Sequence, residues 1–244
     1  MDYFLHIPKT AGTSLLAYLS ESIPPDRLFT VYQHITRRNA PLHRSRIGAE
    51  TFFYGHFSYG FHTLWNDAAP RYTTVLRHPV ERVASFYRYC ASQPDHPLHH
   101  VILRDRLSLG DFVAARLTGQ TNDLFVRYLT GSYRPLPILY DQACNTLARI
   151  CFGRSVRRCP AHRLGAARRT LERFSHVGSV ERVQDTAAFL LAALGCTVPP
   201  KPLGWENATD KGVTPIDPGT RRLIESENEM DLELYHRFCC SASS

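Results

Sequence analysis

The feature that most constrains this chain is a short polar segment between two apolar ones, within its first twenty residues. An apolar run covers residues 3–7, and apolar side chains recur at helical spacing over residues 15–19. Between them lie a lysine, a glycine and three hydroxyl side chains, in the order Pro8, Lys9, Thr10, Ala11, Gly12, Thr13 and Ser14. This order predicts a buried parallel strand, then a loop, then a helix.

The composition of the loop is typical of a site that binds an anion. Gly12 lets the backbone approach a ligand closely, and the first N–H groups of the next helix are unpaired donors. Lys9 adds a mobile positive charge, and Thr13 or Ser14 can cap the helix. The nucleotide-triphosphate P-loop pattern is absent, because the lysine precedes the glycine here. A capped helix that binds no anion is the alternative interpretation.

Length, charge and cysteine spacing narrow the class of protein. With 244 residues, 43% of them hydrophobic, the chain can form one α/β domain. No stretch approaches the roughly 20 apolar residues of a membrane span, and no signal segment precedes the first strand, so we expect a soluble, cytoplasmic protein. A net charge of +7 favours polyanionic partners such as nucleotides, acidic glycans or nucleic acid. The seven cysteines lack zinc-site spacing, so we expect no metal.

A second aromatic and β-branched run, over residues 51–57, predicts a strand that ends near His56. Parallel α/β sheets bind ligands at the carboxyl ends of their strands, so His56 is expected near the first loop. A histidine with an ordinary pKa of about 6.5 can accept a proton at neutral pH. A packed strand-end histidine is the alternative, in which case His6, His62 or, less favourably, Glu81 is the candidate base.

A third predicted strand, residues 71–77, runs into His78-Pro79 and a helix. Arg77 then lies at the junction of strand and helix, and Ser85 lies about two turns into the helix. A guanidinium offers a forked set of donors to phosphate oxygens, and a serine hydroxyl adds a directional bond. The alternative is an arginine paired with a carboxylate and an exposed helical serine.

The rest of the chain alternates between periodic segments and connections. Apolar spacing predicts helices over residues 109–117, 122–129, 166–174, 183–194 and 221–238. A last core strand is predicted at residues 174–178. Segments without a sustained period are interpreted as connections, namely residues 23–50, 92–110, 133–165 and 199–218. Of these, residues 133–165 are expected to form an irregular insertion.

Two of these motifs resemble the PAPS-dependent sulfotransferases, where PAPS is 3′-phosphoadenosine 5′-phosphosulfate. Residues 8–14 resemble the family's 5′-phosphosulfate loop, which usually has two glycines in place of Ala11-Gly12. That substitution is expected to be mild if Ala11 keeps a negative φ. Residues 76–87 resemble the 3′-phosphate element, with the same eight-residue spacing from Arg77 to Ser85. Similarities at residues 177–182 and 231–235, with a weaker one at residues 122–131, extend the resemblance through most of the chain.

The resemblance implies a P-loop-like three-layer α/β fold, with a central parallel sheet flanked by helices, in a single domain of residues 1–244. It implies a bacterial-type member of the carbohydrate 2-O-sulfotransferase-like branch. PAPS would be the donor and 3′,5′-ADP (PAP) the product, with no metal. The implied donor-binding residues are Lys9, Thr10, Ala11, Gly12, Thr13, Ser14, Arg77, Ser85 and Lys211.

The implied catalytic residues are Lys9, which stabilises the leaving phosphate, and His56, which acts as the base. The family's 2-O enzymes show a His-x-His pair, and Tyr54 replaces the first histidine here. The expected partner is a hydroxyl-bearing acceptor, on a saccharide or another small molecule, rather than nucleic acid. A magnesium-dependent small-molecule or nucleoside kinase, a basic nucleic-acid-binding module and a catalytically silent nucleotide-binding scaffold remain the alternatives.

Overall fold

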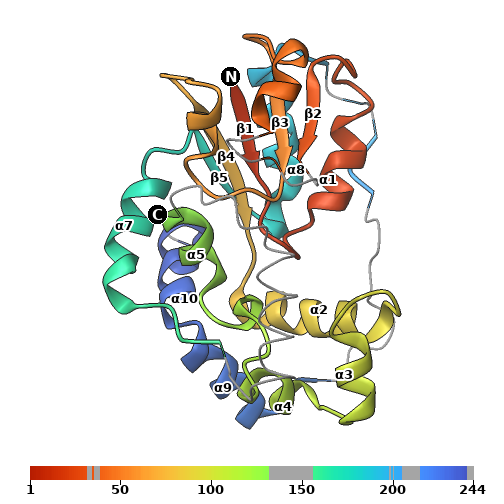
Figure 1. Cartoon of the computed structure of the whole chain (residues 1–244), viewed down its shortest axis with the longest axis vertical. Helices are drawn as coiled ribbons and strands as arrows, with labels where there is room; N and C mark the ends of the chain where they lie inside the picture. The colour runs from red at the N-terminus through yellow and green to blue at the C-terminus, as the bar shows by residue number, and fades with distance from the viewer. Residues whose placement is uncertain are drawn as a thin grey trace.

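The fold is built on one parallel sheet. The computed structural model describes residues 1–31, 35, 39–131, 156–197, 199, 201–204 and 215–240. Within these ranges, five parallel strands lie in the order β2-β3-β1-β4-β5 (Figure 1). The strands are β1 (Asp2–Leu5), β2 (Leu28–Val31), β3 (Phe52–Gly55), β4 (Arg71–Leu76) and β5 (His176–Ser179). The four predicted strands are confirmed, with no end shifted by more than two residues.

Helices connect and cover these strands. They are α1 (Gly12–Leu19), α2 (Pro79–Ser92), α3 (His99–Arg104), α4 (Leu109–Ala114), α5 (Leu124–Thr130), α7 (Leu164–Leu171), α8 (Val183–Ala193), α9 (Pro218–Glu227) and α10 (Glu229–Tyr235). Short 3₁₀ turns lie at Ala40–Arg46, Phe61–Leu64, Gly119–Thr121, Ala161–Arg163 and Val180–Arg182, and a π turn lies at His236–Cys240. Among the helices of the described ranges, none combines the length and apolar character that crossing a bilayer requires.

Both faces of the sheet are buried, which gives three layers. Side chains alternate between the faces of a strand, so Tyr3 and Leu5 enter a core shared with α5, α7 and α10. Phe4 and Tyr54 enter the opposite core, which α1 and α8 cover. Burial on both faces explains why the strands read as continuous aromatic and aliphatic runs. The expected P-loop-like three-layer α/β fold is confirmed.

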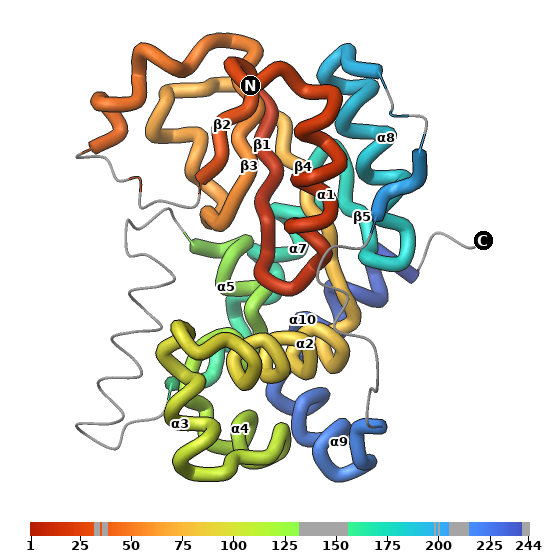
Figure 2. Tube along the Cα trace, turned by 90° about the vertical axis from the view of Figure 1, so that its right-hand side faces the viewer, coloured from red at the N-terminus to blue at the C-terminus, as the bar shows by residue number. Residues whose placement is uncertain are grey.

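A group of helices lies beyond the carboxyl ends of the strands. β4 leads directly into α2, and Figures 1 and 2 place α2, α3, α4 and α9 together below the sheet. Helix α2 packs against both α3 and α9, and α4 packs against α9. This group therefore faces the edge of the sheet at which the predicted anion-binding loop lies.

One predicted connection contains a strand instead. Residues 23–50 were expected to lack regular structure, but Leu28–Val31 form the edge strand β2 beside β3. Only Phe29 and Val31 of this strand are buried. Four residues with half of their side chains turned outward are too short a pattern to distinguish from a loop.

A second predicted connection contains a helix. Residues 92–110 were interpreted as a polar loop, but α3 spans His99–Arg104 within it. Val101 and Ile102 are buried in a small core against Phe86 and Phe112 of α2 and α4. Tertiary packing therefore stabilises a six-residue helix that would be marginal by itself.

The predicted final helix, residues 221–238, is broken in two at Asn228. The buried Asn228 side chain donates to the carbonyl oxygens of Thr121 and Ile224 and accepts from the backbone N–H of Asp123. These bonds satisfy the buried amide across the break between α9 and α10, which no apolar period reveals. The first part of the predicted insertion, residues 133–155, lies outside the described residues. From Val156 the chain is irregular as far as the Ala161–Arg163 turn.

Candidate active site

The predicted anion-binding loop lies at the carboxyl end of β1 and has an unusual backbone. Lys9 has φ 69° and Ala11 has φ 62°, so both lie in the left-handed region. That region costs a non-glycine residue about 1–2 kcal/mol. The condition for a mild substitution, a negative φ at Ala11, is not met, and the left-handed backbone explains why glycine suits this position. Strain of this kind is concentrated at ligand clamps.

The first turn of α1 is left without a side-chain cap. Helix α1 begins at Gly12 and its N-cap residue is Ala11, so Thr13 and Ser14 lie inside the first turn and the prediction that either caps the helix is wrong. The left-handed Ala11 beside the right-handed first turn directs successive N–H groups to one side. An anion at this point would find backbone donors and the positive end of the helix dipole.

Two hydrogen bonds and one packing contact fix the conformation of the loop. The Thr10 hydroxyl donates to the carbonyl oxygen of Ile7 over 2.8 Å, and the Tyr54 hydroxyl donates to the carbonyl oxygen of Gly12 over 2.7 Å. A Cβ added to Gly12 would lie 1.9 Å from Nε2 of His6. Gly12 is therefore required by the ring packed against it, in addition to any close approach of a ligand.

His56 follows β3 at the same edge of the sheet and is held by the neighbouring strand. Its Nδ1 lies 2.8 Å from the carbonyl oxygen of His6. A carbonyl oxygen only accepts, so Nδ1 carries the hydrogen and neutral His56 has its lone pair on Nε2. Burial lowers the pKa of His56, and the bond to the His6 carbonyl opposes that shift. The neutral form of the ring is therefore the tautomer that a general base requires, with its lone pair on Nε2.

His6 lies beside His56 because of the strand register. β1 and β3 are parallel neighbours that pair Leu5 with Gly55, so the next residues, His6 and His56, are adjacent. Their rings stack with centroids 4.4 Å apart and planes 27° apart. His6 is buried, and burial, followed by the charges of His56 and Lys9, keeps its pKa well below the ordinary value. This contact was not predicted, since it depends on the order of strands in the sheet.

The other candidate bases are less suitably placed. His62 forms a hydrogen bond with the hydroxyl of Tyr72, the second residue of β4, at the opposite edge of the sheet from His56. Glu81 lies on α2, with its carboxylate 3.8 Å from Arg221. His6 is at the correct edge but only 6% exposed. The structure thus leaves His56 as the histidine that lies at the loop and is only half-buried.

Lys9 and Arg77 meet at the loop. The Arg77 guanidinium donates to the carbonyl oxygen of Lys9 over 3.5 Å, and the Lys9 ammonium lies 4.4 Å from the centre of the Tyr89 ring on α2. Burial, then the charge of Arg77 and more weakly that of Arg88, lowers the pKa of Lys9. None of the ion pairs among the described residues involves Lys9. This group of cations is therefore suited to an anionic ligand.

Ser85 lies on the same helix as Tyr89. Residues four apart share a helix face, so Ser85 lies on the face of α2 that Lys9 contacts, and its side chain is buried at 5% exposure. The structure thus gathers most of the predicted site at one edge of the sheet. Lys211 lies outside the described residues. The described side chains also include no group of three or more histidine, cysteine, aspartate or glutamate residues placed to share a metal ion.

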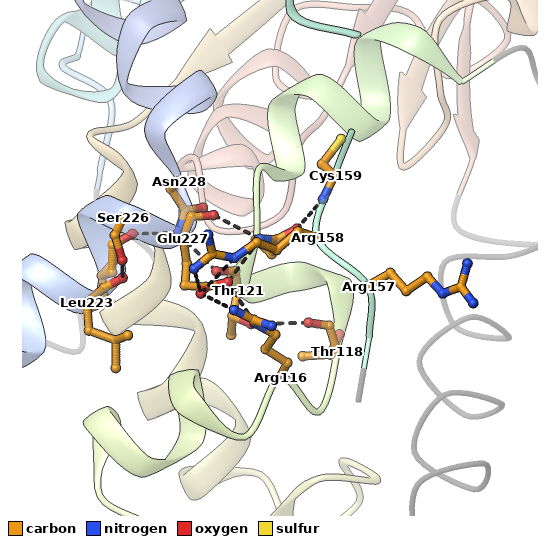
Figure 3. Close-up of polar contacts among 12 residues, drawn as sticks. Arg116, Thr118, Thr121, Arg157, Arg158, Cys159, Leu223, Ser226, Glu227 and Asn228 are labelled. Carbon is orange, nitrogen blue, oxygen red and sulfur yellow. Dashed lines mark hydrogen bonds and ion pairs between the residues drawn. The ribbon is translucent and has the colours of Figure 1, made fainter. Parts of the chain in front are cut away.

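A second polar cluster, which the sequence did not predict, joins α9 and α10 to the segment before α5. Glu227 is 3% exposed and accepts hydrogen bonds from Arg116 and Arg158 (Figure 3). It also accepts a hydrogen bond from the side-chain amide of Asn122. The amide oxygen of Asn122 in turn accepts from the backbone N–H of Cys159. We call these residues the Glu227 cluster. They fasten the chain at residues 158–159 to the C-terminal helices.

Asp123 and Asp231 extend this network by capping each other's helices. Asp231, on α10, accepts from the N–H groups of Phe125 and Val126 at the start of α5. Asp123, just before α5, accepts from the N–H groups of Met230 and Asp231 in the first turn of α10. Each carboxylate therefore satisfies orphan donors of the other helix.

One comparison with a solved structure agrees with this architecture. Neither the protein-family models nor the curated proteins contain a match to the sequence. Among solved structures, a sulfotransferase from Alicyclobacillus acidocaldarius is similar with a TM-score of 0.50 and 16% identity, over 96% of this chain and 94% of that one. A mouse sulfotransferase, SULT7A1 complexed with PAP, aligns with a TM-score of 0.39 and 13% identity, over 100% of this chain and 72% of that one. The first similarity shows that the chain has the fold of a sulfotransferase.

Proposed function

We propose that this chain is a sulfotransferase that moves the sulfuryl group of PAPS to a hydroxyl of an acceptor, on a carbohydrate or another small molecule. The observation that carries the proposal is the combination, at one edge of a sheet with this fold, of a strained cationic loop and a histidine in the tautomer of a base. Both halves are needed, because sulfuryl transfer requires a held anionic donor and an activated hydroxyl.

The donor would bind across the loop and the start of α2. The 5′-phosphosulfate lies against residues 9–14, where backbone N–H groups, the left-handed turns and the Lys9 ammonium converge. The 3′-phosphate lies against Arg77 and Ser85, with Lys211 as a further contact. The hydrogen bond from Arg77 to the Lys9 carbonyl supports this arrangement, because it ties the two phosphate sites together.

The reaction follows from these positions. Nε2 of His56 takes the proton of the acceptor hydroxyl, whose oxygen forms a bond to sulfur. The bond between sulfur and the bridging oxygen of the 5′-phosphate breaks, and its electron pair leaves with 3′,5′-ADP. Lys9 stabilises the charge that develops on that oxygen, so no metal is required. A positioned base of this kind contributes roughly 10²- to 10⁴-fold to the rate.

The position of Tyr54 is relevant to whether the chain belongs to the 2-O-sulfotransferase-like branch. In the 2-O-sulfotransferase-like pattern a histidine precedes the base by two residues, and here Tyr54 holds that position and bonds to Gly12 beneath the loop. We assign Tyr54 to support of the loop and His56 alone to proton transfer. The chain is then a member of that branch with a single histidine base.

The experiment is a transfer assay with PAPS, metal chelated, and a panel of saccharide and small hydroxyl acceptors. We expect one 3′,5′-ADP for each sulfate ester, and a rate in His56→Ala lower by about 10²- to 10⁴-fold with unchanged affinity for 3′,5′-ADP. Burial lowers the pKa of His56, so the neutral base persists below pH 6.5 and the rate falls only at more acid pH. Magnesium-dependent turnover of ATP, with no use of PAPS, would identify a kinase instead.

A further inference from the structure

His6 links the anion-binding loop to His56, although it belongs to neither the donor site nor the reacting groups. Its ring contacts two neighbours. Gly12 leaves no room for a Cβ, which would lie 1.9 Å from Nε2 and 2.1 Å from Cε1 of His6. The same ring stacks on His56 with a centroid separation of 4.4 Å.

The backbone carbonyl and the imidazole ring of His6 both contact His56. Its carbonyl oxygen accepts the hydrogen bond from Nδ1 of His56, while its imidazole covers one face of the His56 ring. The backbone N–H of His6 donates to the carbonyl oxygen of Gly55 over 2.9 Å, which continues the β1–β3 ladder to the residue before His56. His56 is therefore held by its neighbour through one hydrogen bond and one stacked ring.

The His6 side chain carries a buried polar atom that filling space in the core does not require. Nδ1 of His6 is buried without a hydrogen-bonding partner among the described residues. An unsatisfied buried polar atom destabilises a fold, so the stability of the core alone does not account for this side chain. The titratable groups around the pair are Lys9 from the loop and Tyr54 from β3, and the charges of Lys9 and His56 both oppose protonation of His6.

We propose that His6 is a positioning residue, whose flat ring sets the separation between the anion-binding loop and His56 and holds His56 in the orientation in which Nδ1 donates to the His6 carbonyl. The inference rests on the proposed function in that it takes His56 as the base. Its physical content, the orientation and tautomer of His56, exists whether or not the chain transfers a sulfuryl group.

The test is nitrogen-15 and carbon-13 NMR of the full chain with labelled histidine, which reports the tautomer and the pKa of His56 directly. Four proteins are compared with the wild type. His6→Ala removes the ring, His6→Leu keeps bulk without a flat surface, and His6→Phe keeps a flat ring. His176→Ala is the matched control, because His176 also stacks on an aromatic ring, Phe189, with centroids 4.6 Å apart, but from β5.

We expect wild type, His6→Phe and His176→Ala to show His56 protonated on Nδ1 with a pKa below 6.5. His6→Ala and His6→Leu should show both tautomers and a pKa closer to 6.5, because water then reaches the ring. In the transfer assay the same two variants should lose at least tenfold in kcat and shift the acid limb of the pH profile upward. Their affinity for 3′,5′-ADP should stay within threefold of the wild type.

An unchanged His56 tautomer and pKa in His6→Ala or, should that variant not fold, in His6→Leu would overturn the inference. The same holds if His6→Phe behaves like His6→Ala, since the flat ring would then not be what positions the base. Failure of the proposed function has a different signature, namely absence of 3′,5′-ADP binding in the wild type. The NMR measurement does not depend on the binding of 3′,5′-ADP, so it tests the role of His6 whether or not the nucleotide binds.

Discussion

The anion-binding loop (residues 8–14), taken together with the adjoining His6, and the Glu227 cluster are both rich in polar groups. In the cluster those groups are paired with one another, whereas at the loop several are not paired within the described part of the chain. In the Glu227 cluster the buried carboxylate is matched by two guanidinium groups and an amide. At the loop, Lys9 forms none of the ion pairs among the described residues, and Nδ1 of His6 has no partner there. Two loop residues also have left-handed backbones.

This contrast indicates that the Glu227 cluster stabilises the fold, whereas the loop is arranged to bind a ligand. Satisfied buried networks rigidify a structure, whereas strain and unmatched charge persist where a ligand completes the arrangement. We therefore expect replacement of the left-handed Lys9 to impair function while sparing or raising stability. Substitutions in the Glu227 cluster should do the reverse.

The largest effect is expected for Lys9→Gly. The variant removes the charge that faces the leaving phosphate, so transfer should fall by about 10²- to 10³-fold. The same variant places glycine at a left-handed backbone position and so removes the strain of a non-glycine residue there. The free energy of unfolding should therefore rise or stay constant. Turnover of PAPS and urea unfolding measure the two quantities. A variant that lost both activity and stability would remove the contrast between the two regions.

The next effect is expected for Glu227→Ala. It leaves Arg116, Arg158 and Asn122 without their shared acceptor, and we expect about 2–3 kcal/mol lower stability. Affinity for 3′,5′-ADP at a temperature where the variant is folded should not change. Asp185→Asn, which breaks the exposed pair of Arg182 and Asp185, is the control and should leave stability unchanged. A large loss of 3′,5′-ADP affinity in Glu227→Ala would place that cluster in the binding site.

A smaller effect should couple Gly12 to His6. Gly12→Ala alone forces its Cβ into the His6 ring and should destabilise the chain, whereas in a His6→Ala background the space is open. A double-mutant cycle in urea unfolding should give a coupling of about 1–2 kcal/mol in favour of the double variant. Additive effects would mean that the two residues are not in contact in the folded protein.

The smallest effect is expected for Ala11→Gly. Because Ala11 has φ 62°, the glycine should raise the free energy of unfolding by about 0.5–1 kcal/mol. Ala17→Gly within the regular part of α1 is the matched control and should lower it by a similar amount. Equal effects of the two substitutions would show that Ala11 is not in a left-handed conformation.

Much of this architecture could be predicted from the sequence. The apolar runs placed four of the strands, and the polar segment between two apolar ones placed the loop, because both patterns are local. The junction of β4 and α2 likewise put Arg77 at the correct edge of the sheet. Residues that follow parallel strands meet at one edge, so His56 could also be expected there.

What could not be predicted depends on tertiary context. The stacking of His6 on His56 follows from β1 and β3 being neighbours, which periodicity does not reveal. The left-handed Ala11 runs against the preference of alanine, and the next residue accepts a hydrogen bond from Tyr54 on another strand, which the local sequence does not reveal. The break at Asn228 and the Glu227 cluster arise from partners about a hundred residues away in the chain.

The central claim is that the loop, Arg77 and Ser85 bind a nucleotide with a 3′-phosphate and a 5′-phosphate. The most direct measurement is calorimetric binding of 3′,5′-ADP beside 5′-AMP and ATP, without magnesium, on wild type, Arg77→Ala and Arg71→Ala. Arg71 is the matched control, because it is an exposed arginine at the start of β4 that pairs with Asp2. We predict that 3′,5′-ADP alone binds tightly and that only Arg77→Ala weakens it. Equal binding of all three nucleotides, or none, would contradict the assignment.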